Sequence, residues 1–354
     1  MNELEKIIGE IVDIERGAPR LNAFRNAIQQ ADERNELIPR FVLRYGMLQE
    51  SIFSGDRYYA MIIFPELLAL FDENERIRNI PQYDHSMMVA FKWIVECAPE
   101  FPQISKAEID SYFRLFKRRL LERGHSLSIY HMKRCLFYMH CDKGIAAADF
   151  YRFLDAPLDD ISDGKALYHD QQAMYYLSIG EEEKALKAAE PIFSGELTSN
   201  ALPQATHHFF IRFYLDRGEY AKAMEHAKHA ERRSDGDPYY LDILGTLLAL
   251  YGMTEPEHGL RLFVKNHEHY AKSRSPLLRM YFAIGAYHLF RALPDHAVLP
   301  DGCALPKDSG LQEMDIPALR AHFEAAAKEL AQKFDARNGT DDFMNMLQNE
   351  YPAV

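Results

Sequence analysis

The sequence predicts an all-α protein, built as a solenoid of about eight antiparallel helix hairpins. Three observations predict it. Apolar residues recur at every third or fourth position along almost the whole chain, as in Tyr112, Phe113, Phe116 and Leu120. No segment has the polar and apolar alternation with a period of two that a half-buried strand shows. Breaks that contain glycine or proline recur between these helical segments, which is typical of arrays of helix pairs.

Five of the breaks contain glycine, and they lie at Gly55-Asp56, Gly144, Gly180-Glu181, Gly218-Glu219 and Gly252. The last four are separated by roughly 35 residues, a usual period of helical repeats. Glycine adopts positive φ at little cost and so ends the first helix of a pair. The acidic residue that often follows suits the start of the second helix. Pro99 and Pro102 mark one further turn that lacks glycine.

These breaks predict eight helix pairs, the first of them interrupted near Gly17-Ala18-Pro19. In chain order the predicted pairs span residues 2–33, 36–74, 83–123, 125–154, 165–193, 203–233, 238–270 and 276–337. A helix pair of this kind cannot bury its apolar face alone and must stack on its neighbours. The predicted array therefore has one continuous core.

The last pair differs, because its helices are joined by the long loop 294–314. Three prolines in this loop exclude a continuous helix. We interpret the loop as a cap in which Val298, Leu299 and Leu305 cover the open end of the stack. The alternative is a lid or a docking arm, since long loops in tight arrays often carry function.

The segment around Gly218 resembles a tetratricopeptide repeat. Its small, aromatic and close-packing positions are occupied by Ile211, Tyr214, Tyr220, Ala223 and Ala227, and the segment around Gly180 matches at Ala173, Tyr176 and Ala185. The tryptophan of the pattern is absent from these units. The resemblance implies a right-handed superhelix and one continuous domain over residues 1–354. In it, residues 1–164 form divergent hairpins, 165–274 the best-matching repeats, and 275–354 a C-terminal hairpin with a tail.

Composition excludes several classes of protein. The net charge of −12 disfavours attraction to nucleic acid or to an anionic membrane. No apolar run approaches the roughly 20 residues that span a bilayer. The acidic, amphipathic N-terminus does not resemble a secretory signal, so we expect a cytoplasmic protein. The four cysteines lack CxxC spacing, and we expect them to be reduced.

No motif in the sequence predicts catalysis or a cofactor. The 15 histidines include His226 and His229, three positions apart, but no HExxH pattern, and we expect no metal site. There is no GxSxG motif, and Cys135 and His131 are interpreted as packing residues. The adjacent carboxylates Asp159 and Asp160 are interpreted as helix caps or as solubilising charge.

The sequence FDARNGT at 334–340 reads as a helix stop. Asn338-Gly339 suits a left-handed C-cap, and Arg337 complements the helix dipole. The alternative is a polar knot in which Asp335, Arg337 and Asn338 hold the preceding loop.

In a superhelical array the first helix of each pair lines the concave wall. The positions that share the exposed face of these first helices are therefore predicted to contact a partner. They are Tyr45, Gln49, Arg134, Tyr138, Asp170, His208, Arg212, Asp242 and Arg279. Arginines on this wall favour an acidic segment or a carboxylate terminus. The alternative is that each arginine pairs with an acid such as Asp170 or Asp242 and ties repeats together.

The sequence therefore predicts a non-catalytic module that binds a peptide segment or a partner protein in its groove, as a regulator or neutralising partner. Two other classes stay open. One is an enzyme or enzyme subunit that uses the loop 294–314 as a lid over a ligand pocket. The other is a self-assembling scaffold, and the sequence also leaves a homodimer open.

Overall fold

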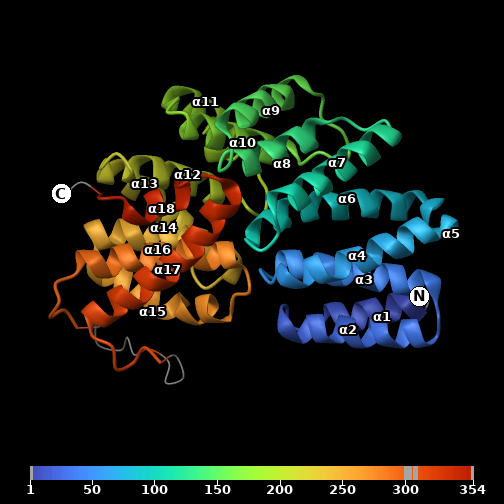
Figure 1. The fold of residues 1–354 in the computed structure, drawn as a ribbon, viewed down its shortest axis with the longest axis horizontal. Coiled ribbons are helices and arrows are strands. Elements are labelled where there is room, and N and C mark those ends of the chain that lie inside the picture. Colours follow the sequence, from blue (N-terminus) through green and yellow to red (C-terminus); the bar gives the residue numbers. More distant parts are fainter. Residues whose placement is uncertain (1–2, 299–304, 306–309, 352–354) are drawn as a thin grey trace. The chain divides into compact units, whose positions relative to one another are not determined.

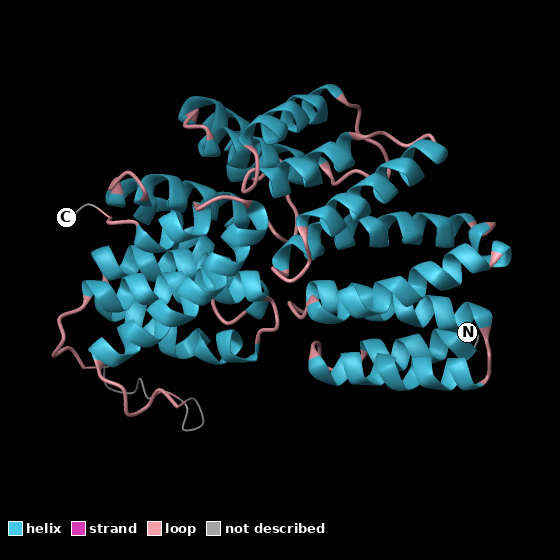
Figure 2. Ribbon diagram, in the orientation of Figure 1, coloured by secondary structure: helices cyan, strands magenta, loops and turns pink. Residues whose placement is uncertain are grey.

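The structure is a computed structural model that describes residues 3–298, 305 and 310–351. These residues form eighteen α-helices and two short 3-10 helices, and no strand occurs among them (Figures 1 and 2). The all-α prediction is confirmed. None of the helices in the described part of the chain is long and apolar enough to cross a membrane.

The chain divides into two compact units, residues 1–162 (unit 1) and 163–354 (unit 2). The division falls close to residue 164, the predicted border between the divergent hairpins and the segments that best match the tetratricopeptide pattern. Each unit is described by itself below, and the single continuous domain stays a prediction.

Unit 1 holds the first nine α-helices, which are α1 (Glu3–Val12), α2 (Ala18–Glu33), α3 (Leu37–Phe53), α4 (Tyr58–Glu73), α5 (Glu75–Arg78), α6 (Pro81–Cys97), α7 (Lys106–Glu122), α8 (Ser128–Tyr138) and α9 (Lys143–Asp155). A 3-10 turn at Ala98–Glu100 lies between α6 and α7, where the two prolines predicted a break. Aromatic rings fill the interior: Phe91 lies 5.0 Å from Phe64 and 6.3 Å from Phe116, measured between ring centroids.

Unit 2 holds the other nine, which are α10 (Lys165–Ser178), α11 (Glu182–Phe193), α12 (Gln204–Leu215), α13 (Tyr220–Ser234), α14 (Leu241–Thr254), α15 (Pro256–Lys272), α16 (Pro276–Ala292), α17 (Ile316–Asn338) and α18 (Asp342–Gln348). One large apolar core runs through these helices. Ala173, Ala185, Ala223 and Ala227, predicted to be close-packing positions, are all completely buried in it.

All eight predicted helix pairs are present, and the two helices of each pair contact one another. The helices α5 and α18 were not predicted. Helical periodicity together with turn residues was therefore sufficient to locate each pair, because both signals are local in the sequence.

Three of the five glycine turns are confirmed, and two are wrong. Gly55, Gly180 and Gly218 have φ of 78°, 82° and 71°. Gly144 instead lies inside α9, whose first turn is capped by the Asp142 carboxylate. Gly252 lies inside α14, where a Cβ would come within 2.9 Å of Leu289 Cα. This glycine serves the close approach of two helices and not a change of chain direction.

The prediction for the loop 294–314 is confirmed in one residue and wrong in another. Leu305 is buried and belongs to the core of unit 2. Val298 is 81 % exposed and therefore covers nothing. Leu299 lies outside the described residues.

The end of α17 has the predicted stop, since Gly339 has φ of 74° and its N–H donates to the Asp335 carbonyl over 2.7 Å. The Asp335 carboxylate accepts hydrogen bonds from the N–H groups of Phe343 (3.1 Å) and Met344 (2.8 Å). Asp335 thus caps the following helix α18.

Candidate functional site

The partner-contacting residues predicted in unit 1 lie on α3 and α8. The Tyr45 ring stacks on Trp93 with the ring centroids 5.9 Å apart, while Gln49 is exposed. On α8, Tyr138 is buried, and its hydroxyl donates to Asp110 Oδ1 over 2.7 Å. Burial and this carboxylate raise the pKa of Tyr138 to about 12. Tyr138 therefore has little surface left for a partner.

Arg134 is part of a buried ionic network. Its Nη1 donates to Asp149 Oδ2 over 2.6 Å, and His131 Nδ1 lies 2.8 Å from Asp149 Oδ1. Asp149, on α9, is completely buried. Arg134 is thus paired with an acid, as the alternative reading expected, but with one in its own hairpin and not in the next.

Asp170, on α10, is buried in unit 2 with 2 % of its surface exposed. The Thr206 hydroxyl donates to Asp170 Oδ1 over 2.6 Å. Burial raises the pKa of Asp170 to about 7, against the lowering effect of this hydrogen bond. Asp170 is a component of the α10–α12 packing and has almost no surface accessible to a partner.

Replacing Asp170 by Asn should stabilise unit 2 more at pH 8 than at pH 5. The folded-state pKa of about 7 lies above the unfolded value of about 3.9. Between these two pKa values the folded state keeps Asp170 protonated, while the unfolded state has released this proton. The free energy of unfolding therefore falls as the pH rises, and the contribution of Asp170 is lost once the pH passes about 7. Asn keeps an acceptor for Thr206 without a charge.

Thermal melts of Asp170→Asn and wild type at pH 5 and pH 8 measure this difference. Other groups titrate equally in both proteins and cancel. Glu183→Gln on the exposed face of α11 is the control. An equal difference in Tm at both pH values would contradict the prediction.

His208 and Asp242 lie together between α12 and α14. His208 Nε2 lies 2.9 Å from Thr246 Oγ1, and its Nδ1 lies 3.9 Å from Asp242 Oδ2. Burial, with a smaller contribution from Arg212, lowers the pKa of His208 to about 3. His208 is therefore a neutral imidazole at physiological pH, and it joins the two helices through a hydrogen bond to Thr246.

The remaining predicted arginines contact aromatic rings. The Arg212 guanidinium lies 5.7 Å from the Tyr281 ring centroid, and Arg279, which is exposed, lies 5.4 Å from the Tyr270 ring centroid. Cations over aromatic faces stabilise by about 0.5–2 kcal/mol. Of these two arginines, Arg279 is exposed, whereas Arg212 is partly buried against Tyr281.

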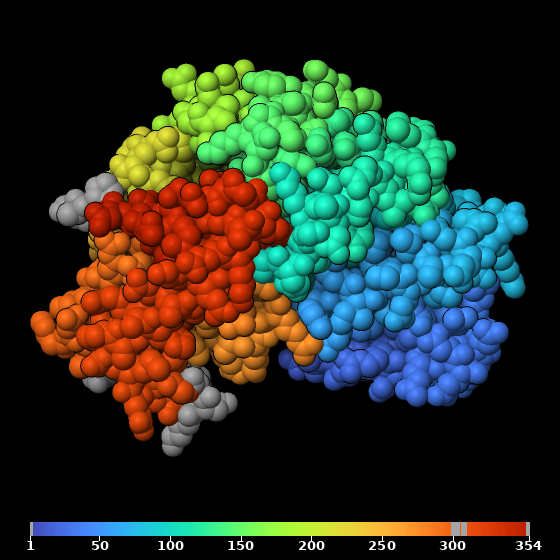
Figure 3. All heavy atoms as spheres, in the orientation of Figure 1, coloured from blue at the N-terminus to red at the C-terminus, as the bar shows by residue number. Residues whose placement is uncertain are grey.

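The residues that follow α18, here called the C-terminal segment and described from Asn349 to Tyr351, pack on α16 and on the end of α12. The sequence did not indicate these contacts. Asn349 Nδ2 donates to Asp216 Oδ1 over 3.1 Å, and Arg291 Nη1 donates to the Asn349 carbonyl over 3.3 Å. The His288 and Tyr351 rings lie 4.8 Å apart. In the space-filling view the red atoms of α17 and α18 cover much of the visible face of unit 2 (Figure 3). These contacts join residues far apart in the sequence, so no local pattern could predict them.

Three histidines gather between α12 and α13. His207 Nδ1 lies 2.8 Å from His226 Nδ1, and the His207 ring stacks on His229 with centroids 4.7 Å apart. Burial lowers the pKa of His207 to about 3 and that of His226 to about 4. His226 points inward to His207, so the pair His226 and His229 acts in packing.

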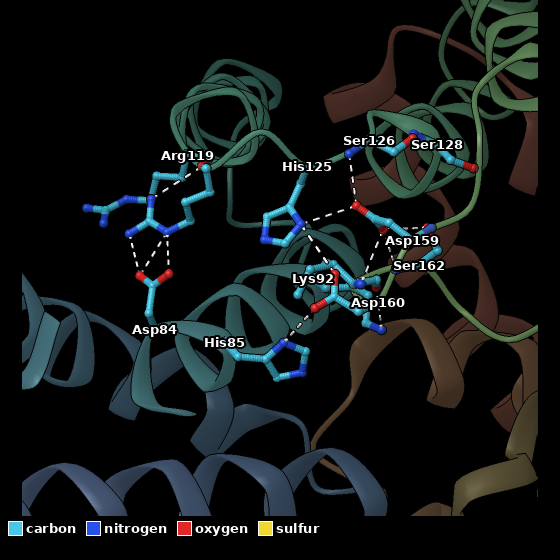
Figure 4. Close-up of polar contacts among 12 residues, drawn as sticks. Asp84, His85, Lys92, Arg119, His125, Ser126, Ser128, Asp159, Asp160 and Ser162 are labelled. Atoms are coloured by element: carbon cyan, nitrogen blue, oxygen red, sulfur yellow. Dashed lines mark hydrogen bonds and ion pairs between the residues drawn. The ribbon is translucent and has the colours of Figure 1, made fainter. Parts of the chain in front are cut away.

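A second polar cluster in unit 1 joins three segments that are distant in the sequence. His125 follows α7, Asp159 and Asp160 follow α9, and His85 lies in the first turn of α6 (Figure 4). The nearest ligand atoms of His125, Asp159 and Asp160 lie within 4.8 Å of one another. Spacing along the chain gave no signal for this cluster, because only the packing of α6, α7 and α9 brings its members together.

No family model, curated protein or solved structure matches this chain at a significant level. The resemblance to the tetratricopeptide repeat therefore stays a prediction.

Proposed function

We propose that this chain is a non-catalytic protein-interaction module, and that its helix pairs stack as in a right-handed tetratricopeptide-like superhelix. Unit 2 binds an extended segment of a partner protein on the face of α12 and α16. The observation that carries the proposal is the chain's own C-terminal segment, which is held on this face by hydrogen bonds of Asn349 with Arg291 and Asp216. Arrays of this kind commonly bind extended peptides.

The contacts with the C-terminal segment specify the chemistry of the partner. His288 Nε2 and Arg291 Nη1 each lie 3.3 Å from a main-chain carbonyl oxygen, of Met346 and Asn349 respectively. Because burial lowers the pKa of His288 to about 4, its imidazole is neutral, and the N–H on Nε2 donates. Because Met346 lies in α18, only the Arg291 contact reaches the residues that follow this helix. A carbonyl contact of this kind holds an extended segment whatever its sequence.

Side chains add the specificity. Arg291 Nη2 lies 3.3 Å from Glu350 Oε1, and the Tyr351 ring packs on His288. Arg212 and Tyr351 are close enough to interact electrostatically. The partner segment that fits this face therefore carries an acidic residue next to an aromatic one, and it competes with the C-terminal segment of the chain.

The test uses a chain that ends at Gln348, so that the face is open. A displayed library of random peptides should be enriched in acidic-aromatic sequences on this truncated chain, and less so on the full chain. Fluorescence anisotropy of an enriched peptide should then show at least about tenfold weaker binding to the truncated Arg291→Glu variant, because a charge-assisted contact is worth about 1.5–3 kcal/mol.

Arg261→Glu, in the same truncated chain, is the matched control. Arg261 is exposed on α15 and away from this face. If the library gives no enrichment, or if Arg291→Glu and Arg261→Glu bind the peptide equally well, the proposed binding face is wrong.

A further inference from the structure

The His125, Asp159 and Asp160 side chains of unit 1 point toward one another, and His85 reaches Asp160 from another side (Figure 4). His125 Nδ1 lies 3.2 Å from Asp159 Oδ2 and 3.4 Å from Asp160 Oδ1. His85 Nδ1 lies 3.5 Å from Asp160 Oδ2. The ligand atoms of His125, Asp159 and Asp160 thus lie within 4.8 Å of one another and face a common point, while His85 contacts the other carboxylate oxygen of Asp160.

These separations are long for hydrogen bonds between histidine and a carboxylate. Charge-assisted N–H···O bonds are usually about 2.7–2.9 Å long. In the same unit, His131 Nδ1 approaches Asp149 Oδ1 to 2.8 Å. In contrast, a tetrahedral ion with bonds of about 2.0–2.2 Å places its ligand atoms about 3.3–3.6 Å apart. The cluster has the spacing of a coordination shell and not that of a compact ion pair.

Outer contacts fix the carboxylate that lies deepest. Asp159 Oδ2 accepts from the Ser126 N–H over 2.9 Å, and its Oδ1 accepts from the Ser162 N–H (3.0 Å) and hydroxyl (2.8 Å). Burial acts to raise the pKa of Asp159, but these hydrogen bonds hold it below its ordinary value. Asp159 is therefore ionised at neutral pH. Such outer contacts orient the ligands of metal sites.

A separate ion pair holds the two histidine-bearing segments together. Arg123 Nη2 lies 2.6 Å from Asp84 Oδ1, and Arg123 Nε lies 2.9 Å from Asp84 Oδ2. Asp84 precedes His85 in α6, and Arg123 lies two residues before His125. The positions of both imidazoles are thus fixed independently of any ion, and the ordering cost of binding one is small.

We propose that His125, Asp159 and Asp160 form a binding site for a divalent transition-metal ion of the zinc class, with a fourth position open to water. One imidazole nitrogen and two carboxylate oxygens suit Zn²⁺ better than Mg²⁺ or Ca²⁺, which prefer oxygen ligands alone. The two carboxylates balance the charge of the ion. The side chains of His85 and Asp160 are 47 % and 67 % exposed, so the ion enters directly from solvent.

The ion binds two segments at once, the turn after α7 and the segment after α9, and Asp160 in turn contacts His85 of α6. The segment after α9 ends at Ser162, the final residue of unit 1. Metal binding therefore orders the C-terminal border of this unit. This role is independent of the peptide-binding face proposed for unit 2.

The full chain, freed of metal by a chelator, is titrated with Zn²⁺ by calorimetry and with Co²⁺ by visible absorption. We expect one site of this kind, with the strong ligand-field bands of tetrahedral Co²⁺. His125→Gln and Asp160→Asn should each weaken Zn²⁺ binding about 100-fold or more, because loss of an outer-shell partner alone costs 10–100-fold. Zn²⁺ should also raise the Tm of the wild type but not of these variants.

His296→Gln and Asp155→Asn are the matched controls, since both side chains are exposed and lie outside the cluster. Far-UV circular dichroism checks that each variant is folded. The proposal is overturned if the wild type binds neither ion. It is also overturned if His125→Gln and Asp160→Asn bind like their controls, which would place the ion on thiols or other histidines.

Discussion

Replacing Gly285 by Ala should destabilise unit 2 by about 3 kcal/mol or more, at the upper end of the usual cost of overpacking. A Cβ at Gly285 would lie 1.9 Å from the carbonyl oxygen of Gly245, and a Cβ at Gly245 would lie 2.3 Å from that of Tyr281. These obstacles are main-chain atoms of α14 and α16, so no side chain can turn away to make room. The two helices must separate, and the core between them opens.

Thermal and chemical unfolding measure this effect, and a loss of this size in a unit of this length lowers Tm by about 6–12 °C. Gly9→Ala in α1 is the control, because a Cβ there meets nothing within 4 Å and alanine favours a helix. Gly285→Ala with a Tm equal to that of the wild type would show that α14 and α16 do not pack through these glycines.

Replacing Arg134 by Leu should cost about 3–5 kcal/mol of stability in unit 1, since it leaves the buried Asp149 carboxylate without its strongest partner. Asp149 would keep only His131 within hydrogen-bonding distance at 2.8 Å. The sequence by itself left two interpretations of Arg134 open, a contact with a partner or a pair with a neighbouring acid. The structure assigns the residue to the interior network.

A double-mutant cycle with Asp149→Leu tests the pair. The double variant should lose much less stability than the sum of the single variants, because a buried ion pair replaced by apolar residues is often close to neutral. Arg152→Ala is the control: Arg152 is 63 % exposed and 3.8 Å from Asp149, so its loss should cost no more than about 0.5 kcal/mol. Additive losses from the two leucine variants would mean that Arg134 and Asp149 do not act as a pair.

The sequence located the eight helix pairs because the signals that mark them are local. A helix places residues three and four positions apart on one face, and the turn between two helices needs positive φ or a proline. These signals put Ala223 and Ala227 in the core, and Gly55, Gly180 and Gly218 at turns. Gly144 and Gly252 carried the same signal for other reasons, a capped helix start and a close contact between helices.

The candidate site residues could not be located from local signals in the same way. The nine predicted partner residues were placed on a wall by helical phase alone, yet Tyr138, Asp170 and His208 are buried with polar partners of their own. Helical phase tells which residues share a face, but it does not tell what covers that face. In unit 2 part of the cover is the C-terminal segment, whose Asn349 contacts Asp216.

The sequence by itself thus determined that this protein is all-α, how many helix pairs it has, and which small residues lie between them. Only the tertiary structure decided which polar residues are buried, that unit 2 holds its own C-terminal segment, and that His125, Asp159 and Asp160 meet. The physical reason is the distance along the sequence over which each interaction acts. Helix formation and turns depend on neighbours within a few residues, whereas burial and coordination depend on segments that packing alone brings together.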